Sequence, residues 1–69
     1  MRANRELGNV IGRLAYQQVL TDDELARRAA VSRGQLNRIR NGRAVPRVRT
    51  AIALAAALRC RVRDVFFLR

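Results

Sequence analysis

The segment from Val31 to Arg43, VSRGQLNRIRNGR, decides what kind of fold the rest of the sequence is expected to build. Its apolar residues Val31, Leu36 and Ile39 are spaced to lie on one side of a helix. Four of its thirteen residues are arginines, and most of the others are small or carry amides. The segment therefore predicts a helix with an apolar back and a front of guanidinium and amide groups.

Two capping boxes mark the starts of two helices, and Asn41-Gly42 is a stop signal for the second. In each box, a hydroxyl residue is followed three positions later by a side chain that can reach back to it. Starts eleven residues apart leave room for a short helix, a tight turn and another short helix. This spacing predicts a helix-turn-helix over about residues 21–42. The capping residues are Thr21 with Glu24, and Ser32 with Gln35.

An apolar stripe near the N-terminus predicts a first helix from Asn4 to about Gln18. The stripe has the i, i+3, i+4, i+7 spacing of an amphipathic helix. Gly8 and Gly12 fall on the opposite side of this helix. They are interpreted either as tolerated positions at a solvent face or as a place where another backbone approaches closely. The stripe consists of Leu7, Val10, Ile11 and Leu14.

Two more helices are expected after the only proline, Pro46. Thr50 is expected to cap a fourth helix, and the tail RVRDVFFLR predicts a short fifth one. No segment predicts a strand, so the fold class is all-α: a compact five-helix bundle in a single domain over residues 1–69. The side chains expected to face the core are Ile52, Ala55 and Leu58 in the fourth helix, and Val62, Val65 and Phe66 in the fifth.

The charge of the chain is strongly positive. Fifteen arginines, no lysine and five acids give a net charge of +10, and no acid interrupts the eleven arginines from Arg27 to Arg63. A small domain with this charge binds polyanions at low salt whether or not binding is its function. A specific function must therefore rest on more than charge.

Several function classes are excluded or disfavoured by composition. The chain has no histidine, no phosphate-binding glycine loop and no nucleophile with a nearby base, so we expect no enzyme, metal, cofactor or small-molecule ligand. Cys60 is the only cysteine, which excludes an internal disulfide and suits a small core residue in a reducing compartment. No apolar run is long enough for a membrane span, and the N-terminus lacks a signal peptide. We expect a cytoplasmic protein that associates with the nucleoid when bound to DNA.

The exposed face of the helix after Ser32 is the candidate functional site. With Leu36 and Ile39 toward the core, Gly34, Asn37, Arg38 and Asn41 lie roughly opposite and Arg33 lies at the flank. Arginine can donate two hydrogen bonds to the O6 and N7 atoms of guanine, and asparagine can form a pair of hydrogen bonds with adenine. Gly34 leaves a gap through which the helix backbone could approach a groove floor. The alternative is an ordinary solvated helix that is merely basic. The candidate base-reading residues are Arg33, Gly34, Asn37 and Arg38.

Three segments carry a resemblance to a known family: Leu25-Ala26, then VSRGQLNRIRNGR with Pro46, then ALAAALRCRVRDVF. Together they resemble the Cro and lambda-repressor-like (XRE-type) helix-turn-helix family, and the resemblance covers about Asn4 to Phe66. The resemblance implies a five-helix bundle that binds duplex DNA, usually as a dimer on a (pseudo)palindromic operator. It implies that Ser32 caps the recognition helix, that Arg33, Gly34 and Arg38 read bases, and that Asn37, Asn41 and Arg43 meet phosphate or sugar. The flanking arginines expected at phosphates are Arg27, Arg28, Arg43, Arg47 and Arg49.

Five positions depart from the family pattern. Asp22 stands where a glutamine often donates to a phosphate, and a carboxylate there would repel the backbone unless it points away or serves the helix dipole. Ala30 replaces a turn glycine and tolerates a left-handed conformation poorly, at about 1 kcal/mol. Arg40 stands where a glutamate usually pairs with helix one, with Ala15 at the partner position. The remaining departures are Arg59 for a usual glycine and Arg61 for a usual N-cap Ser or Thr.

The function expected from these patterns is a sequence-specific, double-stranded DNA-binding transcriptional regulator, a repressor, that acts as a homodimer. A dimer seam is expected at Phe67, Leu68, Gly8 and Gly12, the alternative being that the apolar tail frays over the first helix. Two other functions stay open: a helix-turn-helix scaffold reused to bind proteins, and a non-specific nucleic-acid-binding protein. The chain offers few aromatic platforms for single strands, which disfavours RNA binding.

Overall fold

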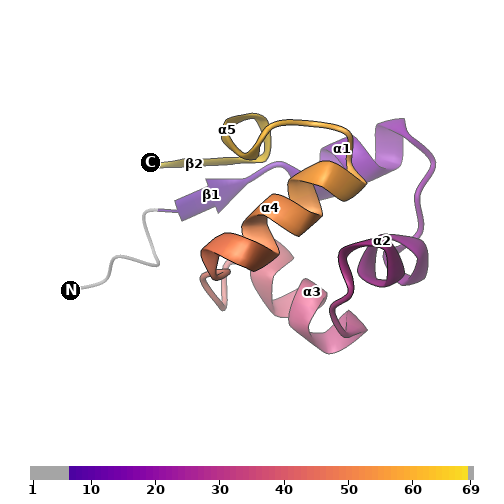
Figure 1. Cartoon of the computed structure of the whole chain (residues 1–69), viewed down its shortest axis with the longest axis horizontal. Helices are drawn as coiled ribbons and strands as arrows, with labels where there is room; N and C mark the ends of the chain where they lie inside the picture. The colour runs from indigo at the N-terminus through magenta and orange to yellow at the C-terminus, as the bar shows by residue number, and fades with distance from the viewer. Residues whose placement is uncertain (1–6, 69) are drawn as a thin grey trace.

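The computed structural model describes residues 7–68, and within this range the chain forms five helices and a two-stranded antiparallel sheet (Figure 1). The expected five helices are therefore confirmed, whereas the expectation that the chain contains no strand is wrong. The elements in chain order are β1 (Leu7–Asn9), α1 (Ile11–Gln17), α2 (Asp22–Ala29), α3 (Arg33–Arg40), α4 (Val48–Ala57), α5 (Val62–Val65) and β2 (Phe66–Leu68).

Helix α4 crosses the middle of the molecule, between α2 and α3 on one side and α1, α5 and the sheet on the other (Figure 1). Its Leu54 side chain is fully buried, and so is Leu58 at its C-terminal cap. Every other helix contributes at least one apolar side chain to the same core, and α2 and α5 pack directly against α4. Cys60 packs half-buried against this core. The fully buried or nearly buried contributors are Ile11, Leu25, Leu36, Ile39 and Val65.

The first helix is shorter than the sequence predicts, because residues 7–9 form strand β1 and α1 begins only at Ile11. Gly8 pairs with Phe67 of β2 and is buried, and the Val10 N–H donates to the Val65 carbonyl at 2.9 Å. A glycine weakens a helix at this position, while the apolar segment 66–68 supplies a β-prone partner, so sheet pairing overrides the helical spacing. Residues 4–6 of the expected helix lie outside the described residues.

Helix α4 starts three residues earlier than expected, and of the three side chains expected to face the core Ala55 and Leu58 do so and Ile52 does not. Its N-cap is Arg47, whose carbonyl accepts the Ala51 N–H at 2.8 Å, so Thr50 lies inside the helix and does not cap it. Ile52 is 54% exposed and does not face the core, whereas Ala55 does, together with Leu54 and Leu58. The early start is consistent with Pro46, whose ring fixes its φ and keeps the preceding residue out of the helical conformation, so that the helix can begin directly after it.

The fifth helix is confirmed as a single turn. Val65 is fully buried and Phe66 nearly so, but Phe66 already belongs to β2, and Val62 is 38% exposed. None of the helices described over residues 7–68 is long and apolar enough to span a membrane.

Helices α1 to α4 all end in the same way, with one residue in the left-handed conformation. At each end, that residue donates its N–H three positions back, and the next residue donates five positions back, the two hydrogen bonds of a Schellman motif. Only the end of α3 has a glycine there, Gly42 at φ +75°. The other three positions carry side chains that disfavour this conformation, namely Val19, Ala30 and Arg59, with φ of 56°, 59° and 58°.

Replacing Ala30 by glycine is expected to stabilise the protein by about 0.5–1 kcal/mol, because relief of the left-handed strain exceeds the added chain entropy of glycine. The matched control is Ala56→Gly, which places the same change at an exposed position within α4. There the substitution should destabilise by about 1 kcal/mol. Thermal or urea unfolding of both variants measures the two signs, and equal losses in the two variants would contradict the proposed strain at Ala30.

Candidate nucleic-acid interface

The two N-caps of the expected helix-turn-helix are confirmed by hydrogen bonds. The Glu24 N–H donates to Thr21 Oγ1 at 3.1 Å, and the Gln35 N–H donates to Ser32 Oγ at 3.0 Å. The side chains of Glu24 and Gln35 make no described bond back to the caps, so each capping box is only half formed. The Glu24 carboxylate instead accepts from two arginines of its own helix, which is a competing and charge-assisted use of the same oxygens.

The outer face of α3 is as exposed as the sequence indicates, with Leu36 and Ile39 buried on its opposite side. A Cβ built on Gly34 would meet nothing within 4 Å, so the helix surface is open there. Asn41 Nδ2 donates to Asn37 Oδ1 at 3.1 Å, which ties the last residues of this face together. A shallow polar hollow is lined by Asp22, Arg33, Gly34 and Asn37. The exposed side chains on the face are Arg33, Asn37, Arg38 and Asn41.

The acidic first turn of α2 pairs with four arginines. Glu24 pairs with Arg27 and Arg28 at 2.9 and 3.0 Å, and Asp23 Oδ1 lies 3.0 Å from Arg33 Nε. All of these side chains are at least 37% exposed. Such pairs contribute about 0–1 kcal/mol each and exchange readily for other anions. Three residues expected to contact DNA are thus held by carboxylates, while Arg38 has no ion pair among the described residues.

Two of the departures from the family pattern, Asp22 and Arg40, contact each other. Arg40 Nη1 lies 2.5 Å from Asp22 Oδ1, which joins the last residue of α3 to the first residue of α2. Ala15, at the position of the usual partner, is buried in the core instead. The Asp22 carboxylate at the start of α2 is therefore paired within the protein. Neither departure from the family pattern, taken alone, predicts this ion pair.

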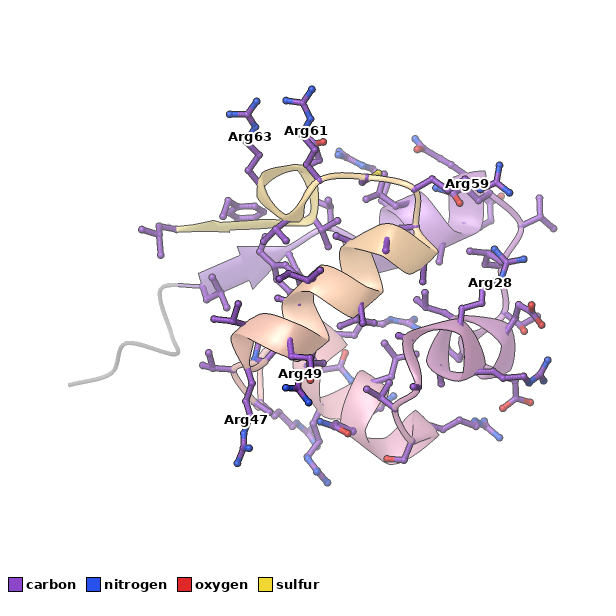
Figure 2. All side chains as sticks on the ribbon, viewed as in Figure 1. Arg28, Arg47, Arg49, Arg59, Arg61 and Arg63 are labelled. Atoms are coloured by element: carbon purple, nitrogen blue, oxygen red, sulfur yellow. The ribbon has the colours of Figure 1, made fainter. Side chains whose placement is uncertain are left out.

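The arginines outside α3 do not gather on one face (Figure 2). Arg47 and Arg49 lie near the N-terminal end of α4, on the side of the molecule where α3 lies, and Arg28 projects from α2 away from α3. Arg59, Arg61 and Arg63 lie on the opposite side of the molecule. The long basic run in the sequence is therefore divided in space, and only part of its charge lies near the outer face of α3.

Asn9 is a positioning residue that the sequence reading missed. Its Nδ2 donates to the carbonyls of Ile39 and Arg40 at 3.1 and 3.3 Å, and its Oδ1 accepts the Ile11 N–H at 3.1 Å. One side chain thus bonds backbone groups at the start of α1 and at the end of α3, where the Ile39 carbonyl also accepts the Gly42 N–H. The signal available in the sequence is weak: an asparagine side chain often accepts the backbone N–H two residues on, as Asn9 does with Ile11.

A helix-turn-helix family model matches residues 13–65, more than half of the chain. The chain belongs to this family, the Cro and C1-type (XRE) helix-turn-helix proteins. The family consists of DNA-binding transcription regulators and not of enzymes, and the matched region includes α2 and α3. Strands β1 and β2, and Asn9 with them, lie outside the matched region. A search of curated proteins found no match.

Proposed function

We propose that this helix-turn-helix protein is a sequence-specific repressor that inserts residues 32–41 into the major groove of duplex DNA. The observation that carries the proposal is the outer face of α3, where exposed amides and Arg38, which makes no ion pair within residues 7–68, surround the open position at Gly34. A helix can enter a major groove, and arginine and asparagine recognise guanine and adenine there. Repression follows if the occupied operator overlaps a promoter. We also propose that residues 1–69 form one domain, in the cytoplasm.

The roles proposed for individual residues follow from their position around α3. Base edges are read by Arg33, Gly34, Asn37 and Arg38. Asn41 donates to one lone pair of Asn37 Oδ1, which leaves both amide N–H groups and the second lone pair of Asn37 for adenine. Arg33 exchanges Asp23 for DNA. The proposed phosphate contacts are Asn41, Arg43, Arg47 and Arg49 near α3, and Arg27 and Arg28 farther along α2.

We propose that the protein binds its operator as a homodimer through the apolar surface beside β2. Phe67 and Leu68 are 43% and 81% exposed, and Val48, Ile52 and Val62 extend this surface along α4 and α5. Exposed apolar side chains grouped in this way are typical of contact surfaces. The apolar tail is held as strand β2, because it pairs with β1, and it does not fray over the first helix.

The two glycines of the expected seam do not belong to this surface. Gly8 is buried in β1, and the position of a Cβ on Gly12 lies 3.6 Å from Arg40 Nε, so a side chain and not a second backbone lies nearest. The interpretation of Gly8 and Gly12 as one open helix face is wrong, because only Gly12 is helical.

Phe67→Asp is expected to shift the protein from dimer to monomer in sedimentation experiments, because dimerisation would bury a carboxylate against apolar side chains. The same variant should weaken operator binding while leaving the thermal unfolding of the monomer nearly unchanged. The matched control is Tyr16→Asp, which changes an aromatic that is 85% exposed on α1, away from the surface beside β2. Unaltered sedimentation of Phe67→Asp would place the seam elsewhere.

The experiment that tests the function is selection of bound sites from a random duplex library at physiological salt. Enrichment of a palindrome is expected, and the spacing of its halves gives the geometry of the dimer. Recovery without enrichment would mean that charge alone binds DNA, with affinity falling steeply as salt rises. An empty selection would overturn the proposal and direct attention to a protein partner.

A further inference from the structure

Arg40 occupies an unusual place for an arginine of a proposed DNA-binding helix. It is the last residue of α3, and its helical position lies on the same side as Arg33 and Asn37, next to the hollow that Asp22 borders. Its side chain passes over Gly12 of α1 before it reaches Asp22, so Nε lies 3.6 Å from the position of a Cβ on Gly12. The guanidinium is thereby directed toward α2.

The ion pair leaves most of the donors of Arg40 unused. Only Nη1 makes a described hydrogen bond, and the side chains of Arg40 and Asp22 are 38% and 43% exposed. A guanidinium carries five N–H donors and binds phosphate as readily as carboxylate. Arg40 is therefore a phosphate-binding group that is already occupied by an anion of its own chain.

We propose that Asp22 is an internal competitor that withholds Arg40 from the DNA backbone and so limits sequence-independent binding. This proposal rests on the proposed function in one respect, namely that the face formed by α3 and the start of α2 is the one that contacts DNA. A chain with a net charge of +10 binds any duplex, and non-specific sites compete with an operator. A carboxylate at the edge of the interface reduces binding to every sequence alike, because it opposes phosphate contact and not base contact. Asp22 thus lowers the affinity for every duplex by the same factor, so the ratio of operator to random-duplex affinity stays the same while less of the protein is held on random DNA.

The salt dependence of binding supplies the expected magnitude. Each phosphate neutralised by the protein changes the slope of log K against log salt by about −0.9. If the added contact contributes nothing at 1 M salt, it strengthens binding about eightfold at 0.1 M salt. Removing the Asp22 charge frees Arg40 for one such contact. The change should be the same for operator and for random duplex.

The experiment compares Asp22→Asn with the wild-type protein on one random-sequence duplex, by fluorescence anisotropy across a salt series. We expect a slope steeper by about 0.9 and affinity about eightfold higher at 0.1 M salt. The matched control is Asp64→Asn, which makes the same change of net charge on α5, where the one hydrogen bond described for the carboxylate is from the Arg61 N–H. The double variant Asp22→Asn/Arg40→Gln should return to the wild-type slope.

Two results would overturn the proposal: equal slopes for Asp22→Asn and Asp64→Asn, or a steeper slope that persists in the double variant. Arg40→Gln provides a second route that does not depend on the stability of Asp22→Asn. It leaves the Asp22 carboxylate unpaired and should weaken random-duplex binding, so unchanged or stronger binding counts against the proposal. Thermal unfolding of each variant confirms that folded protein is compared. Binding to random duplex needs no operator, so failure of the site selection would leave this measurement decisive.

Discussion

Replacing Arg38 by alanine is expected to remove the preference for one base in each half of the operator. Arg38 is exposed on the outer face of α3 and has no ion pair among the described residues, so its fork is available without breaking an internal contact. A bidentate contact to guanine discriminates by about 1–3 kcal/mol, which is roughly ten- to hundredfold in relative affinity. Site selection repeated with the variant should therefore return a motif that is degenerate at one position per half-site.

The matched control for this substitution is Arg47→Ala, which removes the same side chain beside the helix rather than on its outer face. It should weaken binding to all sequences alike and make the salt slope shallower by about one unit. Its selected motif should stay the same. An unchanged motif for Arg38→Ala would refute base reading by Arg38, and a changed motif for Arg47→Ala would mean that the roles of the two arginines are misassigned.

Asn9→Ala is expected to lower the free energy of unfolding by about 2–3 kcal/mol, because it removes three hydrogen bonds that join the start of α1 to the end of α3. The lost contacts are those of Nδ2 to the Ile39 and Arg40 carbonyls and of Oδ1 to the Ile11 N–H. A protein of this size has a total stability of about 3–10 kcal/mol, so the loss is a large fraction. The midpoint of thermal unfolding should fall by roughly 10–20 °C.

Asn9→Asp separates the two ends of this contact. The carboxylate can still accept the Ile11 N–H, but it cannot donate to α3 and it places negative charge beside carbonyl oxygens at a helix C-terminus. We expect it to be at least as destabilising as Asn9→Ala at neutral pH. Asn37→Ala, which removes an exposed amide with a single side-chain bond, serves as the control and should change stability by less than about 1 kcal/mol. A loss for Asn9→Ala no larger than that of the control would refute the role of Asn9.

Local signals predicted the central helices correctly. Thr21 and Ser32 cap α2 and α3, and Asn41-Gly42 ends α3, because these effects involve residues within one helical turn. The outer face of α3 follows from the same periodicity, since the burial of Leu36 and Ile39 fixes the direction of every other side chain on that helix.

Features that depend on distant residues were not predictable in the same way. Strand β1 exists because Phe66–Leu68 pairs with it from the other end of the chain, and the local apolar spacing imitates a helix there. The contact between Asp22 and Arg40 depends on how α2 and α3 cross, so each residue alone looked like an unfavourable substitution. The start of α4 was missed for a different reason: its cap uses backbone geometry at Arg47 and no side-chain acceptor.

The pairing of β1 with β2 also bears on the order in which the molecule assembles. All five helices form from neighbours along the chain, but Leu7 meets Leu68 only after almost the whole polypeptide has been closed into a loop. Loop closure costs more entropy as the loop grows, and long-range contacts slow folding. We therefore expect the sheet to form last, and the contacts of Asn9 with the end of α3 to form at the same stage. On this expectation, α3, the proposed recognition helix, acquires its final support only when residues near the two ends of the described chain have paired.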